Sequence, residues 1–369
     1  MFQAAISVGV SLQGGSMSER NLVVKMFRLV SIATAAVLSG LADMRSAVAQ
    51  TPAEFYKGKT IHLIVGTAAG AAYDFAGRAV AAHLGRFIPG NPAIVVENMP
   101  GAAGLPMMNH LYNRAARDGT VIGLPLNTVV LEPSLKTLSR EGGTVLFDLQ
   151  KMSWIGTPAQ QPQSFVVWKD TPFRSLADLR GKDALFGTTS VGTDSAVMPQ
   201  FTNQLMGTSI KVIAGYKGVT DIFHAMEQGE LQGASVLLSS FLGKQDWVRD
   251  KKARVLLHFG TERIKSIPDV PTAIELASDE EAKLMLRIYA TKFKTTYPLL
   301  LPPGVPEDRI KALRTAFDTA MKDPAMIAEA SRFGIDIDPL GGDEIARLIS
   351  DVEAAPPSVI QKLRKLIEP

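Results

Sequence analysis

The feature that most constrains the fold is a repeated unit in which an apolar strand runs into a loop of small residues and then a helix. Residues 61–65 are such a strand, followed by Gly66-Thr67-Ala68-Ala69-Gly70-Ala71-Ala72-Tyr73-Asp74. Residues 93–97 are another, followed by Asn98-Met99-Pro100-Gly101-Ala102-Ala103-Gly104. Gly and Ala leave the loop N–H groups unobstructed, and the following helix adds the positive end of its dipole. Both loops therefore favour anion binding.

Neither loop carries a phosphate-binding motif. The Lys-Ser/Thr ending of a P-loop is absent, and neither loop has the dinucleotide spacing G-x-G-x-x-G. The pattern favours a carboxylate. In the first loop we expect ligand contacts from the backbone N–H groups of Ala69, Gly70, Ala71, Ala72 and Tyr73 and from the Thr67 hydroxyl. An ordinary strand-to-helix turn is the alternative. Asp74 is either an acceptor for a ligand ammonium or a helix cap.

The whole chain after residue 50 alternates apolar strands with amphipathic helices, which predicts an α/β fold. A third small-residue loop, residues 188–194, again follows a strand and precedes a helix. About 320 residues exceed one comfortable core, so we expect two lobes with an interlobe cleft. Ligands of such sheets bind at the carboxyl ends of the strands, where these loops fall.

Several short motifs, in order along the chain, resemble the periplasmic receptors of tripartite tricarboxylate transporters, the TctC or Bug family. They are Asp74 and Arg78, then Asn98 with Pro100-Gly101-Ala102 and Gly104, Asp118-Gly119-Thr120, Tyr216-Lys217-Gly218, Pro268-Asp269-Val270-Pro271-Thr272 with Glu275, and Pro302-Pro303-Gly304-Val305-Pro306. The resemblance implies a type II periplasmic binding fold. It places lobe 1 at residues 50–157 plus 291–369 and lobe 2 at residues 158–290. It also implies membrane transporter subunits as partners.

The chain departs from the family pattern at two places. Ala71, Ala72 and Tyr73 stand where the family loop has Gly-Ser/Thr before its Asp, so an expected hydroxyl contact is missing. Val197 and Met198 stand where the family often carries a His. Tyr73 offers a ring and a hydroxyl in place of the missing group, and these changes make citrate a poor default ligand.

Further candidate contacts come from other loops. In the second lobe they are the hydroxyls and carboxylate of Thr188, Ser190, Thr193 and Asp194, with Tyr216 beside them. In the first lobe they are Gly101, Ala102, Asn127 and Thr128. A helix cap is the alternative role for Thr193 or Asp194.

The amino-terminal residues 1–49 read as a cleavable signal peptide. Lys25 and Arg28 precede an apolar run at residues 29–41, and Ala47-Val48-Ala49 matches the small-x-small cleavage pattern. We expect cleavage after Ala49 and export to the periplasm.

Composition excludes several functions. The chain has no cysteine, so disulfides, thiolate catalysis and lipoprotein attachment are excluded, and its formal charge of +3 argues against nucleic acid as a partner. The five histidines lack metal-ligand spacing, and no G-x-S-x-G elbow is present. We expect no metal, no cofactor and no catalytic residue.

The sequence thus predicts a monomeric periplasmic receptor that captures a small carboxylate by hinge closure and delivers it to a transporter. Two alternatives stay open: a periplasmic hydrolase that uses Ser190 or Asp74, and a ligand-sensing accessory protein. The ligand class also stays open among dicarboxylates, tricarboxylates, aromatic carboxylates and amino acids.

Overall fold

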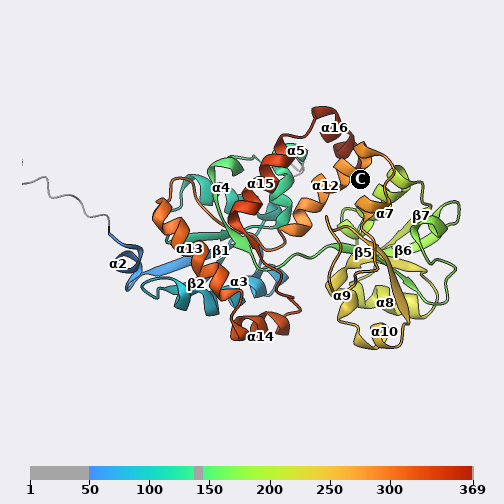
Figure 1. The fold of residues 1–369 in the computed structure, drawn as a ribbon, viewed down its shortest axis with the longest axis horizontal. Coiled ribbons are helices and arrows are strands. Elements are labelled where there is room, and N and C mark those ends of the chain that lie inside the picture. Colours follow the sequence, from blue (N-terminus) through green and yellow to red (C-terminus); the bar gives the residue numbers. More distant parts are fainter. Residues whose placement is uncertain (1–49, 137–143, 368–369) are drawn as a thin grey trace, which may run out of the picture. The chain divides into compact units, whose positions relative to one another are not determined.

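The computed structural model describes residues 50–136 and 144–367 and shows an α/β protein with two sheets (Figure 1). The predicted signal peptide, residues 1–49, lies outside the described residues. None of the described helices is long and apolar enough to span a bilayer.

The first sheet has six strands in the order β11-β4-β10-β3-β1-β2. They are β1 (Thr60–Val65), β2 (Ala93–Asn98), β3 (Val121–Leu124), β4 (Ser153–Thr157), β10 (Leu299–Leu301) and β11 (Leu340–Gly341). β1 is parallel to both β2 and β3, whereas β10 is antiparallel to β3 and β4. The carboxyl ends of β1, β2 and β3 therefore share one edge.

Helices pack against this sheet. They are α3 (Ala72–Leu84), α4 (Leu105–Asn113), α13 (Glu307–Ala320) and α15 (Gly342–Glu353). Helices α2 (Pro52–Tyr56), α5 (Glu132–Leu135), α14 (Pro324–Arg332) and α16 (Pro357–Leu366) pack against other helices. One hydrophobic cluster joins β1 and β3 to α3 and α13, and another contains residues of α4 and α15.

The second sheet has five strands in the order β7-β6-β8-β5-β9. They are β5 (Gln163–Trp168), β6 (Ala184–Thr188), β7 (Ile210–Ala214), β8 (Gly233–Leu237) and β9 (Ala253–His258). β6 is parallel to β7 and β8, while β5 is antiparallel to β8 and β9. The helices are α7 (Asp194–Met206), α8 (Val219–Glu227), α9 (Leu238–Leu242), α10 (Gln245–Arg249), α11 (Ala273–Leu276) and α12 (Glu280–Lys294).

Two segments connect the sheets, residues 158–162 and residues 295–298, and they are hydrogen bonded to each other. The Gln161 N–H lies 2.9 Å from the carbonyl oxygen of Phe293 and 3.1 Å from Thr296 Oγ1. The Tyr297 N–H donates to Thr157 Oγ1 at 3.2 Å. Two connecting segments that are hydrogen bonded in this way are suited to act as a hinge.

The strands predicted at residues 61–65 and 93–97 are present as β1 and β2. The predicted limit of lobe 2 at residue 290 falls inside α12, which runs from Glu280 to Lys294. The lobe limits stay a prediction.

We predict that Gly342→Ala destabilises the fold severely. A Cβ on Gly342 would lie 1.9 Å from the carbonyl oxygen of Trp154, which belongs to the β4 backbone and has no room to yield. The expected loss in the free energy of unfolding is about 3 kcal/mol.

Gly341→Ala is the matched control for this variant. A Cβ at Gly341 meets nothing within 4 Å, and its φ of −75° suits any residue. We expect a change below about 1 kcal/mol. Urea unfolding followed by circular dichroism measures both, and equal losses would contradict the packing argument.

Candidate functional site

The small-residue loops of the first sheet converge at the carboxyl ends of its parallel strands. A Cβ on Gly66, directly after β1, would lie 3.4 Å from the Cα of Gly104 and 3.5 Å from the Cδ1 of Leu126. These three residues belong to the loops after β1, β2 and β3. The topology thus brings the predicted first-lobe loops together.

The Asp74 carboxylate fixes the shape of the first loop. Its Oδ2 accepts the Gly70 N–H at 2.8 Å and Arg78 Nε at 2.9 Å, and its Oδ1 accepts Asn98 Nδ2 at 2.9 Å. Asn98 Nδ2 also donates to the carbonyl oxygen of Thr67 at 3.0 Å. One buried carboxylate therefore connects the loop, the first turn of α3 and the end of β2.

This network keeps Asp74 ionised. Burial raises the pKa of its carboxyl, but the hydrogen bonds from Arg78, Gly70 and Asn98 outweigh burial and lower the pKa to about 2. Both carboxylate oxygens already accept donors from the chain. The geometry favours the structural role for Asp74 over a contact with a ligand ammonium.

The loop residues Ala68, Ala69 and Gly70 are exposed. Gly70 adopts φ +83°, a conformation that glycine takes readily, and its N–H is used by Asp74. The first N–H groups of a helix have no acceptor within it, so those of Ala72 and Tyr73 stay available at the start of α3. Thr67 Oγ1 is buried without a partner in the described residues.

Tyr73 and Asn127 connect this loop to α12. Tyr73 Oη accepts the Asn127 N–H at 3.0 Å, and its ring packs edge-on against Tyr297 with centroids 5.0 Å apart. Asn127 Nδ2 in turn donates to the carbonyl oxygen of Lys292 at 2.9 Å. Both predicted residues lie together, with Tyr73 still free to donate its own proton. Thr128 Oγ1 is buried and has no partner in the described range.

In the second predicted loop, Pro100, Gly101 and Ala102 are exposed, whereas Gly104 is buried. Gly101 has φ +123° and Ala102 has φ +37°, and the Gly104 N–H donates to the Gly101 carbonyl at 2.8 Å. This turn precedes α4 at the same sheet edge, so both predicted residues lie beside the first loop in the fold.

In the second sheet, three hydroxyls form a cluster at the start of α7. Thr188 Oγ1 lies 2.9 Å from Thr193 Oγ1 and 2.6 Å from Ser195 Oγ, and the last two atoms are 2.8 Å apart. Thr193 Oγ1 also donates to the Ser190 carbonyl at 2.7 Å. These bonds hold the loop to β6, so Thr193 occupies the N-cap position without capping through its side chain. Ser195 was missed by sequence reasoning.

Asp194, the first residue of α7, is paired with α12. Its Oδ1 accepts the Tyr289 hydroxyl at 2.7 Å and Lys292 Nζ at 2.8 Å. Burial first, and the Asp194 carboxylate second, raise the pKa of Tyr289 well above its ordinary value. Neither α12 residue was among the predicted site residues. The available signal was a lysine three residues after Tyr289 and directly before Phe293.

The same edge of the second sheet holds further polar groups. The Tyr216 N–H donates to the Thr188 carbonyl at 3.3 Å, which places Tyr216 beside the end of β6. Gln163 Oε1 and Ser235 Oγ are buried without hydrogen-bond partners in the described parts of the chain. Sequence reasoning missed both, because nothing in their neighbours marks them as buried.

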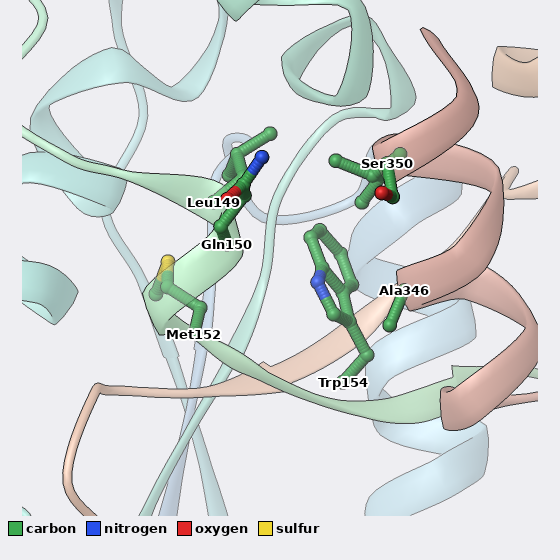
Figure 2. A pocket seen from close by; sticks show the side chains of 7 residues that line it. Leu149, Gln150, Met152, Trp154, Ala346 and Ser350 are labelled. Carbon is green, nitrogen blue, oxygen red and sulfur yellow. The ribbon is translucent and has the colours of Figure 1, made fainter. Parts of the chain in front are cut away.

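A separate small pocket lies between β4 and α15 (Figure 2). It has a cavity volume of about 210 Å³ and is lined by Leu149, Gln150, Met152, Trp154, Ala346, Ile349 and Ser350. It contains none of the predicted site residues and falls below the usual size of ligand pockets. Within residues 50–136 and 144–367, no three His, Asp or Glu side chains form a metal-binding group.

Comparison with known proteins places the chain in a family. The model of the tripartite tricarboxylate transporter family receptor matches residues 78–365. The chain belongs to this receptor family. A curated relative from Cupriavidus necator, the "UPF0065 protein in gbd 5'region", is 23% identical over 339 residues, which cover 90% of this chain and 95% of the relative.

Two solved structures share the fold of this receptor. A ligand-free TctC solute binding protein from Polaromonas has a TM-score of 0.65 at 18% identity, over 85% of this chain and 99% of that one. An R. palustris protein solved with adipate has a TM-score of 0.54 at 16% identity, over 84% and 97%. The expected two-lobed α/β fold is confirmed, and family and fold are those of binding receptors and not of enzymes.

We predict that Asp74→Asn costs about 2 kcal/mol of stability at pH 7, because the amide loses the ionic hydrogen bonds from Arg78 and Gly70. The folded pKa of about 2 lies below the ordinary value of 3.8. The stabilisation is therefore complete above about pH 4 and is lost as the pH falls through about 2. The difference in the free energy of unfolding between the variant and the wild type should therefore decrease as the pH falls from about 4 to about 2.

Urea midpoints measured between pH 7 and pH 2.5 check this prediction. Glu97→Gln is the control, since Glu97 and its partner His62 are both exposed, and it should change stability by less than about 0.5 kcal/mol. A stability difference between Asp74→Asn and the wild type that stays constant with pH would show that Asp74 acts through packing and not through its charge.

Proposed function

We infer that this receptor binds a small carboxylate at the loops described above. The main supporting observation is that the loops after three parallel strands of the first sheet, two of them made of small residues, meet at one edge, with helix N–H groups available there. Uncharged backbone donors hold a carboxylate without leaving an unpaired charge when the site is empty. Adipate in a protein of the same fold agrees with a carboxylate ligand.

The proposed ligand contacts are a subset of those predicted from the sequence, chosen for the donors that remain available in the structure. The N–H groups of Ala72 and Tyr73 and the hydroxyls of Thr67 and Tyr73 serve the first lobe. Residues at the edge of the second sheet serve the other end of the ligand. Closure would occur about the paired crossings at residues 158–162 and 295–298, with ligand contacts to both lobes favouring the closed state.

We also propose that the receptor is exported and delivers its ligand to membrane subunits of a tripartite transporter. Membership of the receptor family supports both points. The leader-like composition of residues 1–49 supports export. A small and a large membrane protein encoded beside this chain would support transport over sensing.

A thermal-shift screen of the purified protein against adipate and other aliphatic, aromatic and amino carboxylates tests the proposal. A ligand at about 100 times its dissociation constant stabilises the fold by about 2.7 kcal/mol, which raises the melting temperature by a few degrees. No shift with any carboxylate, after refolding to remove carried-over ligand, would contradict the function.

We predict that Gly70→Val abolishes this ligand-induced shift. A Cβ there meets nothing within 4 Å, but φ +83° is strained for a β-branched residue, so the loop must move. Gly58→Val is the matched control, since Gly58 has φ +71°, equally open surroundings and a position outside the loops. Both variants should lose about 1–3 kcal/mol of stability. If Gly70→Val still responds to ligand like Gly58→Val, the first loop is not part of the site.

A further inference from the structure

Lys292 is a buried cation at the carboxyl-terminal end of α12. Its side chain is only 6% exposed, and Nζ lies 2.8 Å from Asp194 Oδ1. The ammonium also lies over two aromatic rings, 4.9 Å from the centroid of Tyr289 and 5.7 Å from that of Phe293. A charge in such a position is costly unless it is paired and hydrogen bonded.

The hydrogen bonding of this ammonium is incomplete. A lysine ammonium has three donors. Among the described residues, Asp194 Oδ1 is its single hydrogen-bond acceptor, and that oxygen also accepts the Tyr289 hydroxyl at 2.7 Å. Two N–H groups of Lys292 are thus left for an acceptor that residues 50–136 and 144–367 do not supply.

The position of Lys292 links the two sets of loops. Its own carbonyl oxygen accepts Asn127 Nδ2, and the Asn127 N–H donates to Tyr73 of the first loop. Its ammonium reaches Asp194, which begins α7 between Thr193 and Ser195 of the hydroxyl cluster. A ligand held by the first loop and reaching toward α7 would come to this ammonium.

We propose that Lys292 binds the second carboxylate of a dicarboxylate ligand, while Asp194 and Tyr289 hold its ammonium in position. This rests on the proposed function, since the first carboxylate is the one bound by the first loop. The Asp194 charge is already neutralised by Lys292, and the amino end of α7 adds a positive dipole. The ligand carboxylate supplies the missing acceptor with a charge-assisted hydrogen bond.

The test compares ligands that differ only at the far end. Adipate, hexanoate and 6-aminohexanoate share one chain and end in a carboxylate, a methyl group and an ammonium. Sets of ligands with a shorter carbon chain and the same three end groups, beginning with succinate, test other distances between the two ends of the ligand. Calorimetric titration of the purified wild type should favour the dicarboxylate of the best-fitting set by about tenfold or more.

Lys292→Met should remove this preference. We expect dicarboxylate affinity to fall by about tenfold or more, with monocarboxylate affinity changed less than about threefold. Lys294→Met is the control, because Lys294 lies on the same helix and pairs only at 3.5 and 3.9 Å, with Glu262 and Glu344. It should keep the dicarboxylate preference.

The double variant Asp194→Asn/Lys292→Met leaves no unpaired buried charge, so it keeps the test valid if the single variant fails to fold. It should bind monocarboxylates and dicarboxylates alike. Three results would overturn the role of Lys292. The wild type could bind monocarboxylates and dicarboxylates equally well, or it could prefer 6-aminohexanoate. The third result is that the variants lose affinity for both classes equally. If the wild type binds no carboxylate of any class, the proposed function itself fails.

Discussion

The arrangement of the site depends on one buried carboxylate. Asp74 accepts donors from the loop before α3, from α3 itself and from the end of β2, and thereby fixes the relation of two loops that are far apart in sequence. Loops of Gly and Ala have little side-chain packing to hold them in one conformation, and backbone donors are useful only when they are preorganised. The network supplies the rigidity that the composition of the loops lacks.

A second set of contacts gives α12 a role beyond packing. The backbone of this helix is bonded to Asn127 beside the first loop, and its side chains reach Asp194 at the start of α7. Residues 295–298, which follow α12, are hydrogen bonded to residues 157 and 161 and complete the connection between the sheets. Under the proposed function, opening of the two lobes moves these groups together, so α12 is the element through which ligand binding and hinge position would be coupled.

The sequence predicted those strands and loops whose position is determined by a local residue pattern. Apolar runs followed by small residues located β1, β2, β6 and the loops after them, and parallel pairing brings the first-lobe loops to one edge. What it did not predict depends on tertiary neighbours. Lys292 and Tyr289 bear on the site only because α12 faces α7, and Gln163 and Ser235 become buried only through the packing of the second sheet. Asp74 was correctly placed near the helix start, but of its three partners only Arg78, four residues later in the same helix, could be deduced from spacing.

The most direct test of the central claim is a nuclear magnetic resonance titration of the 15N-labelled protein with the best carboxylate from the thermal screen. We predict that the amide signals of Gly70, Ala72 and Tyr73 shift with saturation, together with those of residues 188–195, while that of Gly58 stays unchanged. Shifts confined to the region of the Trp154 pocket, with the loop amides unaffected, would contradict the account.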